Sequence, residues 1–435
     1  MTAAAKTRNN MKHLVWFRND LRTEDQYALW KATQQAELVI GVYCIDPRQF
    51  APTSYGFPKT GAYRAQFLWE SLRELKRNLK ALNIPLFLHY GHPEVYLPEL
   101  VNTYRINTVY SQYEWTDEEV KVTNALQQTC PHIELQQLQD GFLFHPDDIP
   151  YGSAKEVPEI FTEFRKKCEK LSKIRTLVEP KPMPDSNYFE TPEIPSLESC
   201  GITPQQPDKR TAFPFKGGEN KALARLEDYF FTTENLSQYK QTRNGLMGAN
   251  YSSKFSPWLA HGCISPRKIY WEVQQYEAEV CKNEDTYWLI FELIWRDYFR
   301  YISQKHGNKI FQLDGIVKQK YEWEFNARKF EKWTQGKTPE PFVNANMKEL
   351  ASTGFMSNRG RQNVASFWAK EWEQDWRAGA AWFESLLIDY DVHSNYGNWL
   401  YNSGVGNDPR DRKFNIRRQA EMYDPNNDYQ DLWNT

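Results

Sequence analysis

The first third of the chain alternates between two hydrophobic patterns. Five short runs rich in β-branched and aromatic residues predict strands, at residues 13–17, 38–44, 85–90, 108–112 and 133–138. Residues 59–82 place apolar side chains three and four positions apart with charged residues opposite, which is typical of an amphipathic helix. Strands separated by such helices favour a parallel sheet covered on both faces. The sequence therefore predicts an α/β domain with a doubly wound parallel sheet over 11–140.

The pattern changes twice after this domain. Residues 141–217 are rich in proline, since 11 of the 24 prolines fall between 140 and 215. Proline at that density disfavours helix and sheet, so we expect an interdomain linker with one short helix near 160–174. Helical spacing then predicts an all-α domain over 218–420, with a short polar tail over 421–435. The helices predicted in the all-α domain cover 221–232, 266–276, 286–305, 344–351, 362–372 and 376–388.

Composition narrows the class of protein. The chain has 54 Lys and Arg against 56 Asp and Glu, a net charge of −2, so any contact with nucleic acid must be a local patch. Its six cysteines include no C-x-x-C pair and its histidines do not cluster with carboxylates at metal spacing, so we predict no metal site. No apolar run approaches the roughly 20 residues of a membrane helix. We therefore predict a cytoplasmic protein without a membrane partner.

Two polar clusters suit an anion. A cluster of serines comes before Pro257: Ser252, Ser253 and Ser256. A serine followed by proline is typical of the start of a helix, whose free N–H groups can bind phosphate. An ordinary helix cap is the alternative. Residues 357–362 place two arginines around a glycine, which suits an anion or a flat polar heterocycle. A solvated helix start is the alternative there.

Two carboxylates follow the last predicted apolar helix. Asp389 and Asp391 stand at the start of an amide-rich loop over 389–399. A buried carboxylate without a partner is costly, so we expect an ion pair between Arg361 and Asp389.

One predicted helix carries an acid and an indole on an otherwise apolar face. Glu292, Trp295 and Arg296 lie three or four positions apart. They either line a pocket or, as the alternative, form core with an ion pair between Glu292 and Arg296.

Five segments, taken in order, resemble the photolyase/cryptochrome flavoprotein family over nearly the whole chain. The resemblance implies an N-terminal α/β antenna domain, a long connecting loop and a helical domain that holds FAD, in agreement with the organisation predicted from the patterns. The segments are Trp16–Arg22 (W-F-R-N-D-L-R), Tyr239–Ser256, Glu292–Asp297, Gly354–Arg361 and Asp389–Trp399.

The resemblance also implies which residues hold FAD. Its phosphates would contact Tyr239, Ser252, Ser253, Lys254, Phe255 and Ser256. Its isoalloxazine and ribityl portion would contact Arg296, Asn358, Arg361, Asp389, Asp391 and Asn395. Asn395 matches the position beside the flavin's reactive ring nitrogen, where an amide can donate or accept a hydrogen bond.

Tryptophan is unusually frequent in the all-α domain, since 12 of the 16 Trp follow residue 218. Trp399, Trp376 and Trp323 match the family's relay, which passes electrons from the surface to the excited flavin. Indole suits this task because it is, with the Tyr phenol, the side chain most readily oxidised by one electron. The relay accounts for part of the tryptophan excess, and we assign the remaining indoles to the core.

The substrate pocket of the family's cyclobutane-dimer photolyases is retained in part. Its positions hold Glu292, Trp295, Asn358, Gln362 and Tyr401. Glu292 is expected to hydrogen-bond the damaged bases and Trp295 to stack on them. Gln362 replaces a Met and Tyr401 a second Trp, and together with residues 404–412 this is similar to the DASH cryptochrome branch. The pocket is more polar, and because flipping a base out of duplex costs a few kcal/mol, we expect a single-strand preference.

An antenna and a DNA contact are also implied. The branch carries a folate antenna, methenyltetrahydrofolate, near the domain interface, and Glu114 matches a family acid that contacts it. Damaged single-stranded DNA is the expected partner, and RNA binding stays open. The DNA would contact a basic rim, for which a solvated charged loop is the alternative; the rim residues are Arg359, Arg410, Arg412 and Lys413.

The leading functional hypothesis is a photolyase-type lyase that splits cyclobutane pyrimidine dimers with light-driven electron transfer from reduced FAD. A blue-light photoreceptor or regulator that photoreduces FAD without efficient repair is the alternative. A plain single-strand binder with a vestigial flavin is the third hypothesis. About 20 polar residues follow Arg418, and this short segment favours repair over the long-tailed receptors.

Overall fold

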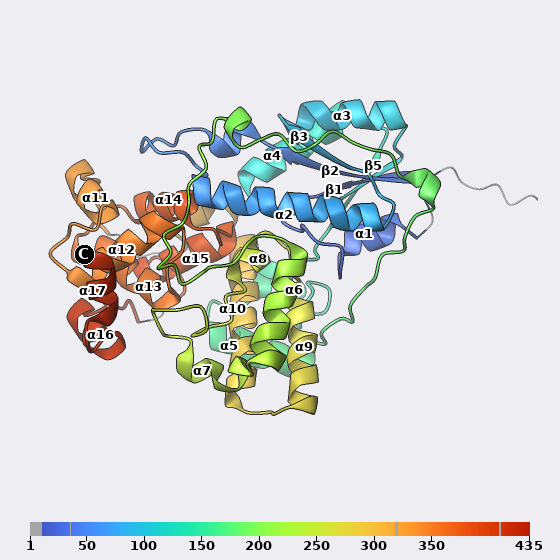
Figure 1. Ribbon diagram of the computed structural model, residues 1–435. Coiled ribbons are helices and arrows are strands. Elements are labelled where there is room, and N and C mark those ends of the chain that lie inside the picture. The colour runs from blue at the N-terminus through green and yellow to red at the C-terminus, as the bar shows by residue number, and fades with distance from the viewer. Residues whose placement is uncertain (1–10, 35, 318–320, 409) are drawn as a thin grey trace, which may run out of the picture.

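The computed structural model describes residues 11–34, 36–317, 321–408 and 410–435. Its N-terminal part is a five-stranded sheet in the order β3-β2-β1-β4-β5, and all neighbouring strands are parallel (Figure 1). The predicted doubly wound sheet is therefore confirmed, with each strand within one or two residues of its expected ends. The strands are β1 (Lys12–Trp16), β2 (Leu38–Ile45), β3 (Leu86–Tyr90), β4 (Thr108–Gln112) and β5 (Glu134–Leu138).

Helices cover both faces of this sheet because both faces of its central strands are apolar. In β1, Val15 belongs to the core on the side of α2, whereas Leu14 and Trp16 belong to the core on the side of α3 and α4. Figure 1 shows α2 between the sheet and the helical domain, with α3 on the far face. These helices are α1 (Tyr27–Ala32), α2 (Ala62–Ala81), α3 (Pro93–Tyr104) and α4 (Asp117–Thr129).

The proline-rich segment wraps the sheet domain, and its side chains bond the backbone of β2 and β3. Asn187 donates to the carbonyl of Val39 and accepts from its N–H, both at 2.9 Å, and Thr191 donates to the carbonyl of Leu86 at 2.6 Å. The one predicted linker helix is present as α5 (Phe161–Leu171), inside the expected range.

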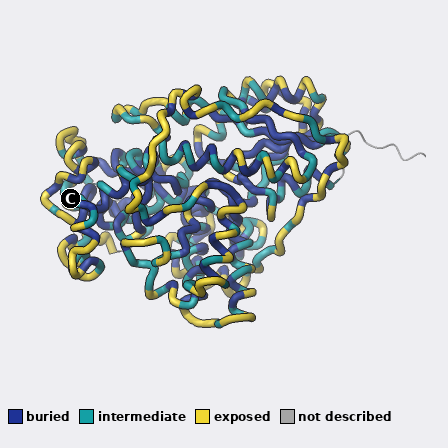
Figure 2. The backbone as a smooth tube through the Cα atoms, viewed as in Figure 1, coloured by how far each residue is buried: buried dark blue, intermediate teal, exposed yellow. Residues whose placement is uncertain are grey.

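The helical domain surrounds the site described below. Figure 2 shows buried chain in the sheet and the inner helices, with exposed chain at the periphery. The α-helices of the helical domain are α6 (Glu219–Glu227), α7 (Tyr239–Thr242), α8 (Ser256–Ala260), α9 (Pro266–Glu279), α10 (Glu284–His306), α11 (Ala327–Thr334), α12 (Pro341–Thr353), α13 (Asn358–Ser366), α14 (Trp376–Leu386), α15 (Val392–Ser403), α16 (Ile416–Tyr423) and α17 (Asp428–Asn434).

Two segments differ from the sequence-based expectation. The amide-rich stretch over 389–399 is not a loop beyond its first residues, because the Asp391 side chain accepts from the N–H of Ser394 and starts α15. The polar tail is instead part of the fold: α16 crosses the boundary expected at 420, and Tyr429 and Trp433 of α17 are buried against α12. Polar residues on the outer faces of these helices hid both from the hydrophobic pattern.

Buried ion pairs join the two domains. Arg22 lies 2.9 Å from Asp140, and Arg267 of α9 lies 2.5 Å from Asp140 and 2.9 Å from Asp25. All four side chains are at most 10% exposed. Charges buried this deeply are tolerated because each has a partner of opposite sign. This network fixes the start of the linker against both domains.

Candidate cofactor and substrate site

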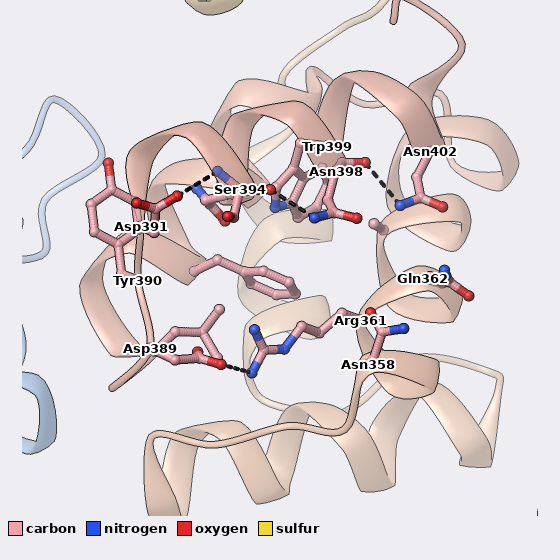
Figure 3. A pocket seen from close by; sticks show the side chains of 14 residues that line it. Asn358, Arg361, Gln362, Asp389, Tyr390, Asp391, Ser394, Asn398, Trp399 and Asn402 are labelled. Carbon is pink, nitrogen blue, oxygen red and sulfur yellow. Dashed lines mark hydrogen bonds and ion pairs between the residues drawn. The ribbon is translucent and has the colours of Figure 1, made fainter. Parts of the chain in front are cut away.

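Two adjoining cavities open in the helical domain. The larger has a volume of about 1120 Å³ and lies between the segment 239–256, α10 and α13. The smaller, about 490 Å³, lies between α13, the end of α14 and α15. Figure 3 shows α15 side chains facing those of α13 across this smaller cavity. The residues shared by both linings are Asn358, Arg361, Asp389, Asp391, Ser394 and Asn398.

The residues expected at the phosphates lie together on one wall. The larger cavity is lined by Tyr239, Ser252, Ser253, Lys254, Phe255 and Ser256. Contrary to the expected cap, Phe255 is the N-cap of α8 and Ser256 its first residue, with no side-chain capping bond. Lys254 has a left-handed backbone with φ of 64°, and its buried Nζ has no hydrogen-bond partner among the described residues. This wall therefore presents hydroxyls and an amine that lies over the Tyr251 ring, with Nζ 3.1 Å from the ring centroid.

An ion pair at the junction of the cavities confirms the expected partner of one buried acid. Arg361 Nη2 lies 2.8 Å from Asp389 Oδ2, and a dashed line marks this ion pair in Figure 3. The Asp389 side chain is 2% exposed, and within the described ranges its second oxygen, Oδ1, has no hydrogen-bond partner. A buried oxygen without a partner is costly unless a ligand donates to it. Asp389 Oδ1 is thus an acceptor for a bound group.

Charges on α10 and α15 surround the second acid. Burial acts to raise the pKa of Asp391, but the charges of His393 and Arg300 outweigh it and hold that pKa well below its usual range. Arg300 lies 3.3 Å from Asp391. Arg296 is half-buried and donates to the carbonyl of Gly141 at 2.6 Å, and desolvation together with the charge of Arg300 lowers its pKa to about 10. A negative ligand group beside Arg296 would meet an unneutralised cation.

The expected substrate residues are divided between the cavities and their border. Glu292 lines the larger cavity and pairs at 2.6 Å with Arg243, and not with Arg296 as the core alternative required. Gln362 lines the smaller cavity. Trp295 and Tyr401 meet edge to face with ring centroids 5.9 Å apart, at the border and outside both linings.

Of the three indoles expected in the relay, two are buried and one is half-buried. Trp399 is buried and lines the smaller cavity; Trp376 is buried on α14 and donates to the carbonyl of Leu313 at 3.0 Å. Trp323 is half-buried and donates to the carbonyl of Ala369 at 3.0 Å.

A fourth indole, Trp333, packs against Trp399 and belongs to the core, as expected for the indoles outside the relay. The ring of Trp333, which is fully buried on α11, packs 6.2 Å from that of Trp399 and 5.1 Å from that of Trp368. The high tryptophan content of this domain is the one sequence feature that pointed to this contact, because Trp333, Trp368 and Trp399 are far apart in the sequence.

The expected basic rim is partly neutralised. Arg412 lies 2.9 Å from Asp408 and donates to the Tyr401 hydroxyl at 2.9 Å, Arg410 lies 3.9 Å from Asp408, and Lys413 pairs with Glu371. Arg359 donates to Asn244 and Gln362 and stacks over Tyr423. Pro409, in the middle of this stretch, lies outside the described residues.

The acid expected at the antenna lies where the sheet domain meets the helical domain. Glu114 is 4% exposed and lies 3.8 Å from His393 Nε2. Burial acts to raise its pKa, but the neighbouring His393 and the charge of Arg300 outweigh it, so the pKa is lowered. The neighbouring Trp115 donates to Ser303 Oγ at 2.6 Å and stacks on His393.

One cluster outside this site has metal-type ligands. Asp46, His92 and Glu94 lie together near the surface of the sheet domain. Arg48 bonds both carboxylates, at 2.5 and 2.8 Å, so it compensates part of their charge and occupies their oxygens, and we assign no ligand to the cluster.

Comparisons with known proteins agree with this geometry. Residues 13–185 match the family model described as DNA photolyase, and residues 288–434 match the model described as the FAD binding domain of DNA photolyase. The cryptochrome DASH of Gloeobacter violaceus is 48% identical over 97% of this chain and 85% of that protein. Over the described residues, no helix is long and apolar enough to cross a membrane.

Solved structures of similar proteins have the same architecture. The cryptochrome of Synechocystis sp. PCC6803 superposes with a TM-score of 0.92 at 46% identity, over 97% of this chain and 88% of that one. An archaeal photolyase from Sulfolobus tokodaii, described as having two FAD molecules, superposes with a TM-score of 0.78 at 26% identity, over 97% of this chain and 90% of that one.

Proposed function

The chain belongs to the cryptochrome DASH branch of the DNA photolyase family, and we propose that it splits cyclobutane pyrimidine dimers under blue light, preferentially in single-stranded or unpaired DNA. The observation that carries the repair proposal is that Glu292 lines the same cavity as Arg361 and Asp389, with Arg243 as its ion-pair partner. An acid that lines the cofactor cavity can hold a damaged base against the bound cofactor.

The donors and acceptors of the cavities fit FAD. The serine and lysine wall offers hydroxyl and amine donors to a pyrophosphate, and Asp389 Oδ1 offers an acceptor. Arg361, Asn358 and Asn395 line the part of the cavities that would hold the isoalloxazine and ribityl groups. The chemistry that FAD supplies when bound is light-driven donation of one electron to the dimer, which opens the cyclobutane ring and returns the electron.

The substrate residues would orient the lesion, and Arg243 would compensate the charge of Glu292. Glu292 would hydrogen-bond the damaged bases while Arg243 stabilises its charge, and Trp295 would stack on a base. Gln362 and Tyr401 offer polar contacts in place of stacking area, so the pocket offsets less of the cost of flipping a paired base. This difference supports the single-strand preference. Arg359, Arg410, Arg412 and Lys413 would contact the phosphates.

The indoles Trp399, Trp376 and Trp323 would relay electrons to the cofactor from an external thiol. We propose that methenyltetrahydrofolate binds near Glu114 as the antenna. Replacing Trp376 by Phe should slow photoreduction with an external thiol, measured from the absorption of the bound flavin. If photoreduction instead runs unchanged in Trp376→Phe and slows in Trp333→Phe, the relay assignment is wrong and the Trp333 contact carries the electron.

The repair proposal is tested at Glu292. The variant Glu292→Gln should lower light-dependent dimer loss in a single strand about tenfold or more, because a hydrogen bond to a charged group is lost. The matched control is Glu284→Gln, on the same helix but pairing with the half-exposed Lys240. Equal repair by the two variants would reject the role of Glu292. Photoreduction without dimer loss in the unmodified protein would favour the photoreceptor alternative.

A further inference from the structure

The interdomain linker contacts the border of the substrate site. Phe161, the first residue of α5, is 7% exposed, and its ring lies 3.6 Å from that of Trp295 with an angle of 10° between the planes. This is a close face-to-face stack. It covers one face of the indole that the proposed function assigns to the substrate.

Aromatic residues of α10 hold Phe161 in this position. Its ring meets Phe291 edge to face at 5.3 Å and Tyr298 edge to face at 5.5 Å. Edge-to-face contacts on either side of a stacked ring restrict its rotation and sliding. The orientation of Trp295 is therefore fixed from the linker side by a ring that is itself held.

The residue two positions earlier joins the linker to the other side of the border. The Glu159 carboxylate accepts from Asn407 Nδ2 at 2.6 Å and pairs with Lys305 at 2.8 Å, and its carbonyl accepts from the Tyr298 hydroxyl at 2.5 Å. Burial acts to raise the pKa of Glu159, but hydrogen bonds from His306 and Lys305 outweigh it and lower that pKa to about 2.

Asn407 is followed by Asp408, the acid that pairs with Arg412 of the basic rim. Asp408 pairs with Arg412, which donates to the hydroxyl of Tyr401, and the Tyr401 ring meets Trp295 edge to face. The segment from Glu159 to Phe161 thus contacts α10 directly and the 404–412 loop through Asn407. The linker therefore reaches Trp295 by two routes, directly through the Phe161 ring and indirectly through Asn407 and Tyr401.

We propose that Phe161 of the linker is the positioning residue that presents one face of Trp295 to a pyrimidine of the lesion. The inference rests on the proposed function, because it names how the same site recognises its substrate. With one face covered by Phe161, the indole has only its other face for a base. Phe161 therefore determines where the base stacks without touching it.

The experiment measures dark binding of a dimer-containing single strand and of the same strand undamaged. Phe161→Leu removes the stack and should weaken binding of the damaged strand about threefold to tenfold, with the undamaged strand unchanged. Phe161→Tyr keeps the ring and should restore the affinity. Phe164→Leu is the matched control, since Phe164 is fully buried on the same helix and contacts Tyr298 and Tyr301.

A double-mutant cycle separates positioning from simple packing. If Phe161 acts through Trp295, Phe161→Leu has no further effect on damaged-strand binding when Trp295 is already Leu. Flavin absorption and the thermal midpoint report whether each variant folds. Equal weakening by Phe161→Leu and Phe164→Leu, or a Phe161 effect that persists without Trp295, would overturn the inference alone. No preference for the damaged strand in the unmodified protein would overturn the proposed function itself.

Discussion

Two buried polar atoms on residues that line the larger cavity are available to a ligand. Lys254 Nζ and Asp389 Oδ1 have no hydrogen-bond partner within the part of the chain that the structure describes, and each lies on a residue that lines the larger cavity. A bound group that accepts from Lys254 Nζ and donates to Asp389 Oδ1 would satisfy both atoms. The motif order predicted both residues and the ion pair between Arg361 and Asp389.

The partner of Glu292 could not be predicted in the same way. Helix spacing favours an ion pair with Arg296, four positions along the same helix. The structure pairs Glu292 with Arg243, which lies 49 positions earlier, just after α7. The tertiary contact between α7 and α10 brings these two residues together, and local sequence spacing cannot predict such a contact.

A buried acid next to the phosphate wall gives a prediction for pH. Burial raises the pKa of Glu349 to about 7, against a hydrogen bond from Tyr429 and the charge of Lys254. The folded protein therefore holds a proton that the unfolded chain releases, and this contribution to stability falls as the pH rises through 7. Between pH 6 and 8 the unfolding free energy of the unmodified protein should fall by about 1 kcal/mol more than that of the Glu349→Gln variant. Urea unfolding at both pH values measures this difference. Parallel pH profiles would contradict the assignment.

A glycine on α14 gives a prediction for the relay. A Cβ at Gly379 would overlap Cη2 of the Trp399 indole. Gly379→Ala should therefore displace the indole or the helix, slow photoreduction and destabilise the protein by about 1–3 kcal/mol. Flavin photoreduction kinetics and thermal unfolding check the two effects. An unchanged rate together with unchanged stability would show that the indole is not held by this contact.

At the scale of elements, hydrophobic periodicity predicted those with a clear apolar stripe. All five strands, α2, α5 and the long α10 are present near their expected positions. The helices α15 and α17 were missed because amide and acidic residues occupy their exposed positions. Their ends are set by side-chain caps: Asp391 starts α15, and Asp424 accepts from the N–H groups of Tyr429 and Gln430 in α17. A capping signal is weaker in a sequence than an apolar stripe.

The last helix gives a prediction at this scale. Trp433 of α17 is 2% exposed in the core that includes α12. Trp433→Ala should cost about 3–5 kcal/mol of unfolding free energy, because a large buried ring is lost and a cavity remains. Thermal and urea unfolding measure the loss, with the exposed Met422→Ala on α16 as control. A variant as stable as the native protein would mean that residues 421–435 behave as the polar tail expected from composition.

At the scale of the molecule, the linker connects the two domains and borders the site. The network of Arg22, Asp140 and Arg267 fixes where it starts, and Phe161 reaches Trp295 further along it. Proline content predicted a connection. It could not predict this contact, because the function of a linker residue depends on which helix the linker passes.

The charge balance of the whole chain gives a prediction for DNA. Because the net charge is −2 and Asp408 and Glu371 partly neutralise the rim, only a few cations are free to release counterions from DNA. Dark binding of a damaged single strand should weaken with salt at a slope of about two to three, and Arg410→Ala should reduce that slope, because Arg410 is exposed and lies 3.9 Å from Asp408. A flat salt response would contradict the basic rim.

The most direct test of the account follows dimer loss during anaerobic blue-light illumination of the reduced flavoprotein. The same dimer is supplied in a single strand and in a duplex, with dark samples in parallel. We predict a flavin absorption spectrum and light-dependent dimer loss that is much faster in the single strand. Flavin photoreduction without dimer loss in either substrate would contradict the repair proposal, and equal rates in both would contradict the single-strand preference.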